Sequence, residues 1–216
     1  MILLLCIVLF GCSSGSDLNS QLDEVFSADR KEETLRRNNY STYLDYYLPS
    51  DIFELESGML TNYFLYDDSR LIMDVNVSGI VNDRYYPEEQ IKDEGFFDED
   101  KLVYAHSGVY VDNEGSEHEY LYKVYGYEEN YLTYFVSRDL IFYGYAEKED
   151  VVGLSSRILL LAKGTIVRED AVAAGYSLKN EIDYEKKQVN LFETIMPVNG
   201  NVNDFVIGDD VDGQTE

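Results

Sequence analysis

The sequence is short of several residue types that particular chemistries require. Its 216 residues include no tryptophan, two cysteines, two histidines and three prolines, and 17 basic residues stand against 42 acidic ones. A formal net charge of −25 excludes DNA or RNA as a direct partner, because phosphate binding requires clustered Lys and Arg. The charge favours solubility and repulsion from anionic surfaces. The alternative interpretation is recruitment of divalent cations or of a basic partner.

The two histidines predict no metal site. His106 and His118 lie on the two arms of one predicted hairpin, with His106 opposite Tyr122 and His118 opposite Tyr110. The two rings are then four rungs of the ladder apart, which is roughly 13 Å at about 3.3 Å per residue. Side chains at that separation cannot coordinate the same zinc ion.

Other catalytic signatures are also missing from the sequence. It contains no G-x-S-x-G or S-x-x-K pattern for a nucleophilic serine and no Gly-rich loop of the kinds that hold nucleotide phosphates. The segment GDDVDG, residues 208–213, fails as an EF-hand calcium loop because Gly208 occupies the first ligand position. A pair of glycosidase carboxylates cannot be recognised in so acidic a chain. The sequence therefore predicts no catalytic residue, no metal and no cofactor.

A nine-residue apolar run, ILLLCIVLF, occupies residues 2–10 and is followed by the small and polar stretch GCSSGSD. The run is too short to span a bilayer, which takes about 20 residues. Its length is that of the hydrophobic region of a signal peptide. No Lys or Arg precedes it, whereas secretory signals begin with a positive region, so we expect the true start of the protein upstream of Met1.

The stretch LFGC resembles the lipobox of bacterial lipoproteins, with Leu9 at −3, Gly11 at −1 and Cys12 as the modification site. In that family the cysteine thiol receives a diacylglycerol, and a peptidase cuts the chain just before it. The resemblance implies a signal peptide at residues 1–11 and a mature chain held by a lipid on Cys12 at the extracytoplasmic face of a bacterial membrane. Because Cys6 would leave with the signal, the mature chain would have no disulfide and no free thiol.

Hydrophobic periodicity divides the remainder of the chain. We expect a flexible tether at 12–29, one domain at 30–197 and a flexible acidic tail at 198–216. From residue 18 the apolar residues fall at helical spacing, so this part is expected to be a solvated helix or a coil. Apolar residues at helical spacing predict a helix from about residue 30 that ends before Pro49. Further helices are predicted within 147–164, 168–177 and 181–196, with Val151, Leu154, Ile158 and Leu161 facing inward in the first and Ile182, Val189, Phe192 and Ile195 in the last.

Residues 59–67 and 70–78 predict a hairpin with Asp68–Ser69 as its two-residue turn. This register places Tyr66 opposite Leu71 and Phe64 opposite Met73, which makes one face almost wholly apolar. The other face is polar, and a sheet with one wet face is expected. Tyr63, Asp74 and Asn76 share that polar face and form the predicted ligand-binding cluster, with a merely solvated sheet face as the alternative.

A second block of alternating residues, about 102–146, predicts two more hairpins. The turn DNEGS at 112–116 joins the first pair of strands, and Arg138–Asp139 joins the second. Both faces of the second hairpin are apolar, so we expect it in the middle of the sheet, covered on both sides, or with one face used as a Tyr-lined ligand groove. The 20 tyrosines favour such half-buried strand positions.

These patterns predict an α+β fold, in which N-terminal and C-terminal helices pack on a Tyr-rich antiparallel sheet built from hairpins. Together with the lipobox resemblance, they lead us to expect a membrane-anchored extracytoplasmic lipoprotein with a non-catalytic binding or scaffolding role toward an unknown envelope protein or ligand. The alternatives are the solute-binding subunit of an importer, and an envelope hydrolase or its inhibitor.

Overall fold

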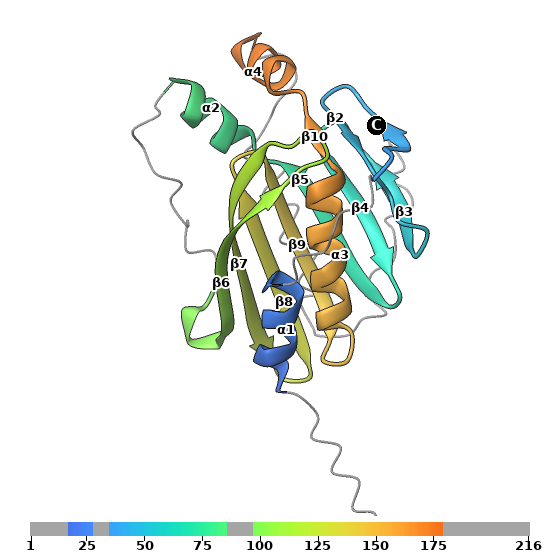
Figure 1. The fold of residues 1–216 in the computed structure, drawn as a ribbon, viewed down its shortest axis with the longest axis vertical. Helices are drawn as coiled ribbons and strands as arrows, with labels where there is room; N and C mark the ends of the chain where they lie inside the picture. The colour runs from blue at the N-terminus through green and yellow to red at the C-terminus, as the bar shows by residue number, and fades with distance from the viewer. Residues whose placement is uncertain (1–16, 28–34, 86–96, 179–216) are drawn as a thin grey trace, which may run out of the picture.

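Seven antiparallel strands form the central sheet of the protein (Figure 1). The structure is a computed structural model, and it describes residues 17–27, 35–85 and 97–178. The predicted signal peptide, Cys12, the predicted helix at 181–196 and the predicted tail lie outside the described residues.

The strand order of the large sheet is β3-β4-β5-β9-β8-β7-β6, and a small sheet has the order β1-β2-β10. The large sheet consists of β3 (Ile52–Ser57), β4 (Thr61–Tyr66), β5 (Ser69–Val75), β6 (Leu102–Val111), β7 (Glu117–Tyr127), β8 (Asn130–Ser137) and β9 (Leu140–Glu147). The small sheet consists of β1 (Asn39–Tyr40), β2 (Leu44–Tyr46) and β10 (Ile166–Val167).

The helices are α1 (Leu18–Ser27), α2 (Val77–Tyr85), α3 (Val151–Gly164) and α4 (Glu169–Leu178), with a short 3-10 turn, η1 (Glu99–Lys101). Figure 1 shows α1 and α3 against one face of the large sheet, and α2 and α4 at one end of it. The four residues predicted to face inward on α3 are all fully buried in the shared core. The predicted α+β fold is confirmed.

The hairpin β8–β9 lies at the centre of the sheet, as its two apolar faces predicted. Val136 pairs with Ile141 and Tyr134 with Tyr143, in the register expected from the sequence. One face packs under α1 and α3. On the other face the ring of Phe97 lies 5.3 Å from the ring of Tyr134, so this face is part of the packed interior.

The predicted register of the first hairpin is wrong by two residues. The turn is Asp67–Asp68, so that Tyr66 pairs with Ser69 and Phe64 with Leu71. Asp67 adopts a φ of 48°, a left-handed conformation that Asp tolerates better than most residues and that a tight hairpin turn requires. The pairing is shifted by two residues, and side chains alternate between the two faces of a strand with a period of two residues. The shift therefore leaves every side chain on its predicted face, and the apolar face still points to the core.

The predicted helix from residue 30 to Pro49 is also wrong. Residues 39–40 and 44–46 form β1 and β2, whose partner in the small sheet is β10, far along the chain. Tyr43 and Tyr46 are buried there, and aromatic residues suit strands as well as helix stripes. Residues 18–27, which we assigned to the tether, form α1, and Leu22 and Val25 are buried against the domain. This segment therefore belongs to the folded body.

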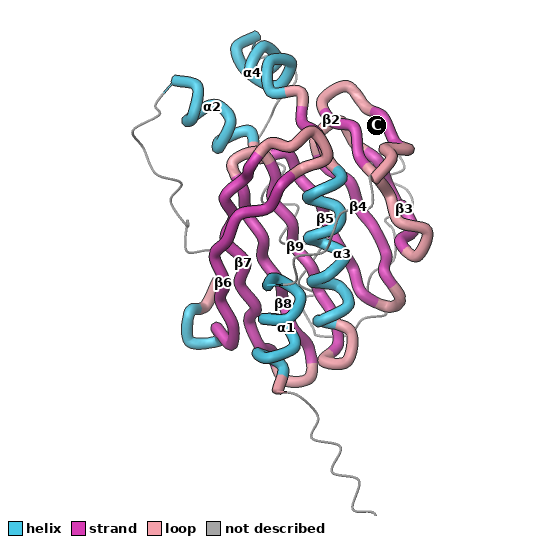
Figure 2. The backbone as a smooth tube through the Cα atoms, in the orientation of Figure 1, coloured by secondary structure: helices cyan, strands magenta, loops and turns pink. Residues whose placement is uncertain are grey.

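The two ends of the large sheet differ (Figure 2). One end holds the start of α1, the β7–β8 turn and the β9–α3 turn, and we call it the α1 end. The other holds the β6–β7 loop, the β8–β9 turn, α2 and α4, and we call it the α4 end.

Gly144 on β9 lets α3 approach the sheet closely. A Cβ atom at this position would lie 2.7 Å from Leu154 Cδ2 on α3 and would also collide with Thr133 Oγ1 on β8. We predict that Gly144→Ala lowers the free energy of unfolding by about 1–3 kcal/mol, because the helix must shift to relieve the overlap. Urea unfolding measures this loss. The control Gly126→Ala, whose Cβ would meet Val103 Cγ1 at 3.2 Å, should cost clearly less. Equal costs would contradict the proposed close approach.

Candidate functional site

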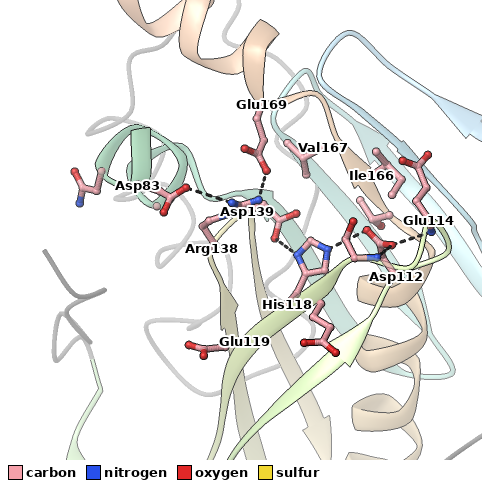
Figure 3. A pocket seen from close by; sticks show the side chains of 15 residues that line it. Asp83, Asp112, Glu114, His118, Glu119, Arg138, Asp139, Ile166, Val167 and Glu169 are labelled. Carbon is pink, nitrogen blue, oxygen red and sulfur yellow. Dashed lines mark hydrogen bonds and ion pairs between the residues drawn. The ribbon is translucent and has the colours of Figure 1, made fainter. Parts of the chain in front are cut away.

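A hollow of about 900 Å³ opens at the α4 end of the sheet (Figure 3). It is formed by α2, the β6–β7 loop, the β8–β9 turn and the segment that leads from β10 into α4. Its acidic lining residues are Asp83, Asp112, Glu114, Glu117, Glu119, Asp139 and Glu169. Among the described lining residues the basic ones are His118 and Arg138.

His118 lies between two buried aspartates, and we call this group the His118 clamp. Its Nε2 is 2.9 Å from Asp112 Oδ2, and its Nδ1 is 3.5 Å from Asp139 Oδ1. The imidazole also stacks on the ring of Tyr110 at 4.9 Å, with 9° between the planes. Figure 3 shows the ring bridging the two carboxylates. The clamp thereby ties the β6–β7 loop to the β8–β9 turn.

The β6–β7 loop shapes one half of the clamp. Asp112 Oδ1 accepts hydrogen bonds from the backbone N–H groups of Glu114 and Ser116. This is the local bonding by which Asp stabilises turns. Gly115 supplies the φ of +87° that the loop needs. Because Asp112 Oδ1 accepts these hydrogen bonds from the loop, the other carboxylate oxygen, Oδ2, faces His118.

The β8–β9 turn supplies the other half. The Ser137 hydroxyl donates to Asp139 Oδ1 at 2.9 Å, and the backbone of Asp139 accepts the Asn76 N–H. Ser137 pairs with Tyr120 of β7, so the β8–β9 turn stands two residues along the ladder from His118. Strand register, rather than nearness in sequence, brings Asp139 to the imidazole.

The surrounding charges keep His118 protonated. Hydrogen bonding to Asp139 raises its pKa, and bonding to Asp112 adds to this, so that the pKa reaches about 9 despite the opposing effect of burial. Burial by itself raises the pKa of Asp112, but the hydrogen bonds from His118 and from the backbone of Ser116 and Glu114 lower it overall. The clamp is therefore an imidazolium between carboxylates at neutral pH.

This protonation state decides what the clamp can do. Both ring nitrogens of an imidazolium are donors, so neither has a lone pair for a metal ion or for proton abstraction. Both nitrogens also face carboxylates of the protein itself. The geometry suits a rigid tie between two loops better than a catalytic base.

Arg138 closes the hollow on the side of the helices. Its guanidinium pairs with Asp83 of α2 at 3.2 Å and with Glu169 in the first turn of α4. Burial raises the pKa of Glu169, while the nearby charge of Arg138 opposes that shift. Arg138 thus connects the two helices across the β8–β9 turn, next to the His118 clamp.

The predicted ligand-binding residues lie elsewhere. Tyr63 and Asp74 share a face of the large sheet, but Tyr63 pairs with Ile72, and Asp74 pairs with Thr61. Asp74 is 7% exposed and accepts a hydrogen bond from the Thr61 hydroxyl at 2.8 Å. The expectation of a wet face is wrong here, because this side belongs to the second aromatic layer.

Asn76 follows β5 and begins α2. Its Oδ1 accepts the Gly79 N–H at 2.9 Å, and its Nδ2 donates to the Ser137 carbonyl at 2.7 Å. The side chain is 4% exposed, and these two bonds connect the start of α2 to β8. The structure does not bring Asn76 together with Tyr63. A ligand-binding role for Tyr63, Asp74 and Asn76 stays a prediction.

The sequence pattern presents His118 only as a possible zinc ligand, paired with His106. The register that it predicted for both histidines is confirmed, with His106 opposite Tyr122 and His118 opposite Tyr110. It missed the carboxylates on either side of His118. The Asp112-to-His118 spacing across a tight hairpin loop was the one available signal, since Asp139 comes from another hairpin.

Comparisons with known proteins add no identity. No family model, no curated protein and no solved structure matches the chain. Within the part of the chain that the structure describes, no group of three or more His, Cys, Asp or Glu side chains is arranged to hold a metal ion. Among the helices of residues 17–27, 35–85 and 97–178, none is long and apolar enough to cross a bilayer.

The placement of Asn76 predicts a structural cost on mutation. Asn76→Ala should lower the free energy of unfolding by about 2–3 kcal/mol, because it removes a helix cap and leaves a buried carbonyl unsatisfied. Asn76→Asp keeps the cap acceptor but loses the donor to Ser137, so its cost should be comparable. Chemical denaturation measures both. If neither variant loses stability, the two hydrogen bonds do not hold α2 to β8.

The His118 clamp predicts a pH-dependent contribution to stability. The pKa of His118 is raised in the folded state, so its stabilisation is complete below about pH 6.5 and is lost as the pH rises through about 9. We predict that His118→Gln lowers the free energy of unfolding by about 2–3 kcal/mol near pH 6, and that the loss shrinks at about pH 10. Urea unfolding at both pH values measures the difference.

Glu117→Gln is the matched control for this experiment. Glu117 is exposed on the same strand, one residue before His118, and lines the same hollow. It should change the unfolding free energy little at either pH, because exposed charges contribute little. A His118→Gln loss of equal size at both pH values would contradict the protonated clamp.

Proposed function

We propose that this protein is a lipid-anchored extracytoplasmic lipoprotein that binds or scaffolds an envelope partner and does not catalyse a reaction. The observation that carries the proposal is the stretch LFGC at residues 9–12, followed after five residues by the first turn of α1. This arrangement suits a folded domain attached closely to a lipidated Cys12.

The site supports a binding role more than a catalytic one. Among the described residues that line it, His118 is held as an imidazolium by Asp112 and Asp139, and Arg138 is shared by Asp83 and Glu169. These groups are engaged in fixing loops and helices around the hollow, which gives a preorganised surface. The net charge of −25 favours partners with basic surfaces and disfavours anionic ones.

The importer alternative receives less support. Such solute-binding subunits resemble two α/β lobes built on parallel sheets. The described residues instead form one antiparallel seven-stranded sheet with a small three-stranded sheet beside it. No observation in the site favours the hydrolase or inhibitor alternative.

The lipid anchor is tested by metabolic labelling. We expect the protein, expressed from its own gene in its own host with an azide-bearing fatty acid, to acquire the label and to sediment with membranes. Cys12→Ser should remove the label and release the protein, because the thiol is the acceptor.

Cys6→Ser is the matched control, since Cys6 would leave with the signal peptide; this variant should label normally. If the wild-type protein and Cys12→Ser are both unlabelled, the proposed anchor is wrong. If Cys6→Ser loses the label, the modified residue has been misassigned.

A further inference from the structure

We infer that the anchored domain stands upright on the membrane, with its α1 end toward the bilayer and the hollow around the His118 clamp facing away from it. This inference rests on the proposed lipid on Cys12. In this orientation the α1 end of the sheet faces the membrane, and the α4 end is available to the partner.

The α1 end is a well-defined surface. Asp17 and Leu18 line one shallow hollow together with Val103 at the start of β6 and with Lys148 and Glu149 in the β9–α3 turn. The start of α1 therefore lies directly beside the turns at this end. The hollow around the His118 clamp is formed by α2, the β6–β7 loop, the β8–β9 turn and the start of α4. Figure 1 shows these elements at the opposite end of the same strands.

Chain geometry restricts how the domain can be oriented. Leu18 is six residues after Cys12, and six residues of extended chain reach about 22 Å at most. The ten-residue strand β6 separates the two ends by roughly 30 Å at about 3.3 Å per residue. If the α4 end lay on the bilayer, Leu18 would stand roughly 30 Å above the membrane surface, which is farther than the reach of about 22 Å between Cys12 and Leu18. The inverted orientation is therefore excluded.

The charge at the α1 end opposes close contact between that end and an anionic bilayer. The described turns and strand ends there carry Asp67, Asp68, Asp98, Glu99, Asp100, Glu128, Glu129, Glu147, Glu149 and Asp150, against the basic residues Lys101 and Lys148 and against Lys123 of β7, which pairs with Glu99. Such a surface is repelled by anionic headgroups over about one Debye length, which is about 30 Å at 0.01 M salt. Repulsion opposes contact with the bilayer, while the tether limits how far the domain can move away.

The cations at the other end include arginines held in ion pairs. Arg84 of α2, Arg138 of the β8–β9 turn and Arg168 before α4 all lie at the α4 end, and each is paired with a carboxylate there. The acidic residues that line the hollow lie at this end too, so both ends of the domain are acidic. An outward-facing α4 end leaves the hollow open to a partner that approaches from outside the membrane.

Energy transfer from single labelled cysteines to acceptor lipids tests the orientation. The acylated protein would be purified from membranes and placed in vesicles of phosphatidylcholine with phosphatidylglycerol at low salt. Labelling sites would be Lys148→Cys at the α1 end, Ser107→Cys halfway along β6 and Ala174→Cys on α4, all of which are exposed positions. The lipidated Cys12 has no free thiol to compete for the dye.

We expect transfer efficiency to fall in the order Lys148→Cys, Ser107→Cys, Ala174→Cys, because distance from the lipid plane rises in that order. Equal efficiencies at the three sites would mean that the domain lies flat or tumbles, and would overturn the inference. The reverse order would overturn it as well.

Salt gives a second measurement on the same samples. Raising the salt from about 0.01 M to about 0.1 M shortens the Debye length from about 30 Å to about 10 Å. Transfer from Lys148→Cys should then increase, since the acidic end can come closer to the headgroups. An unchanged signal would overturn the electrostatic part of the inference.

Vesicle flotation separates failure of the orientation from failure of the anchor. If the protein does not float with vesicles, and Cys12→Ser behaves identically, the proposed anchor is wrong, and the orientation fails with it. If the protein floats but the three sites transfer equally, the anchor stands and only the orientation is wrong.

Discussion

The register of the three neighbouring strands β7, β8 and β9 is the constraint on which the rest of the structure depends. Strands β8 and β9 are apolar on both faces, so a slip of one residue would exchange the side chains packed beneath α3 with those packed around Phe97. Pairs such as Tyr134 with Tyr143 fill both layers with aromatic rings. The same register carries Gly144 under α3, where a larger side chain does not fit.

The candidate site is a product of that register. Because β7 and β8 pair as they do, the β8–β9 turn stands beside the β6–β7 loop, and His118 connects Asp112 to Asp139. A protonated histidine between two buried carboxylates offsets part of their mutual repulsion and uses both ring nitrogens as donors. The group therefore holds together the two loops that line the hollow at this end of the sheet.

Much of the fold could be predicted because its signals are local. Alternation along residues 102–146 predicted the hairpins β6–β7 and β8–β9, and the apolar stripe of residues 151–164 predicted α3. The predictions failed where a local sequence pattern was compatible with two different structures. Tyr43 and its neighbours fit a helix stripe, but they form short strands because β10 supplies a partner. The hairpin turn moved to Asp67–Asp68 because Asp67 adopts a positive φ, which alternation alone does not reveal.

By itself the sequence determined the apolar faces of the strands and of α3, the acidic character of the surface and the position of Cys12 in a lipobox-like stretch. Only the tertiary structure decided which side chains form the site. Asp139 and His118 belong to different hairpins, and Asn76, which the sequence grouped with Tyr63 and Asp74, instead holds the start of α2 to β8. Periodicity specifies which face a residue occupies. The neighbour that it meets across the sheet depends on the register and order of strands, which long-range packing sets.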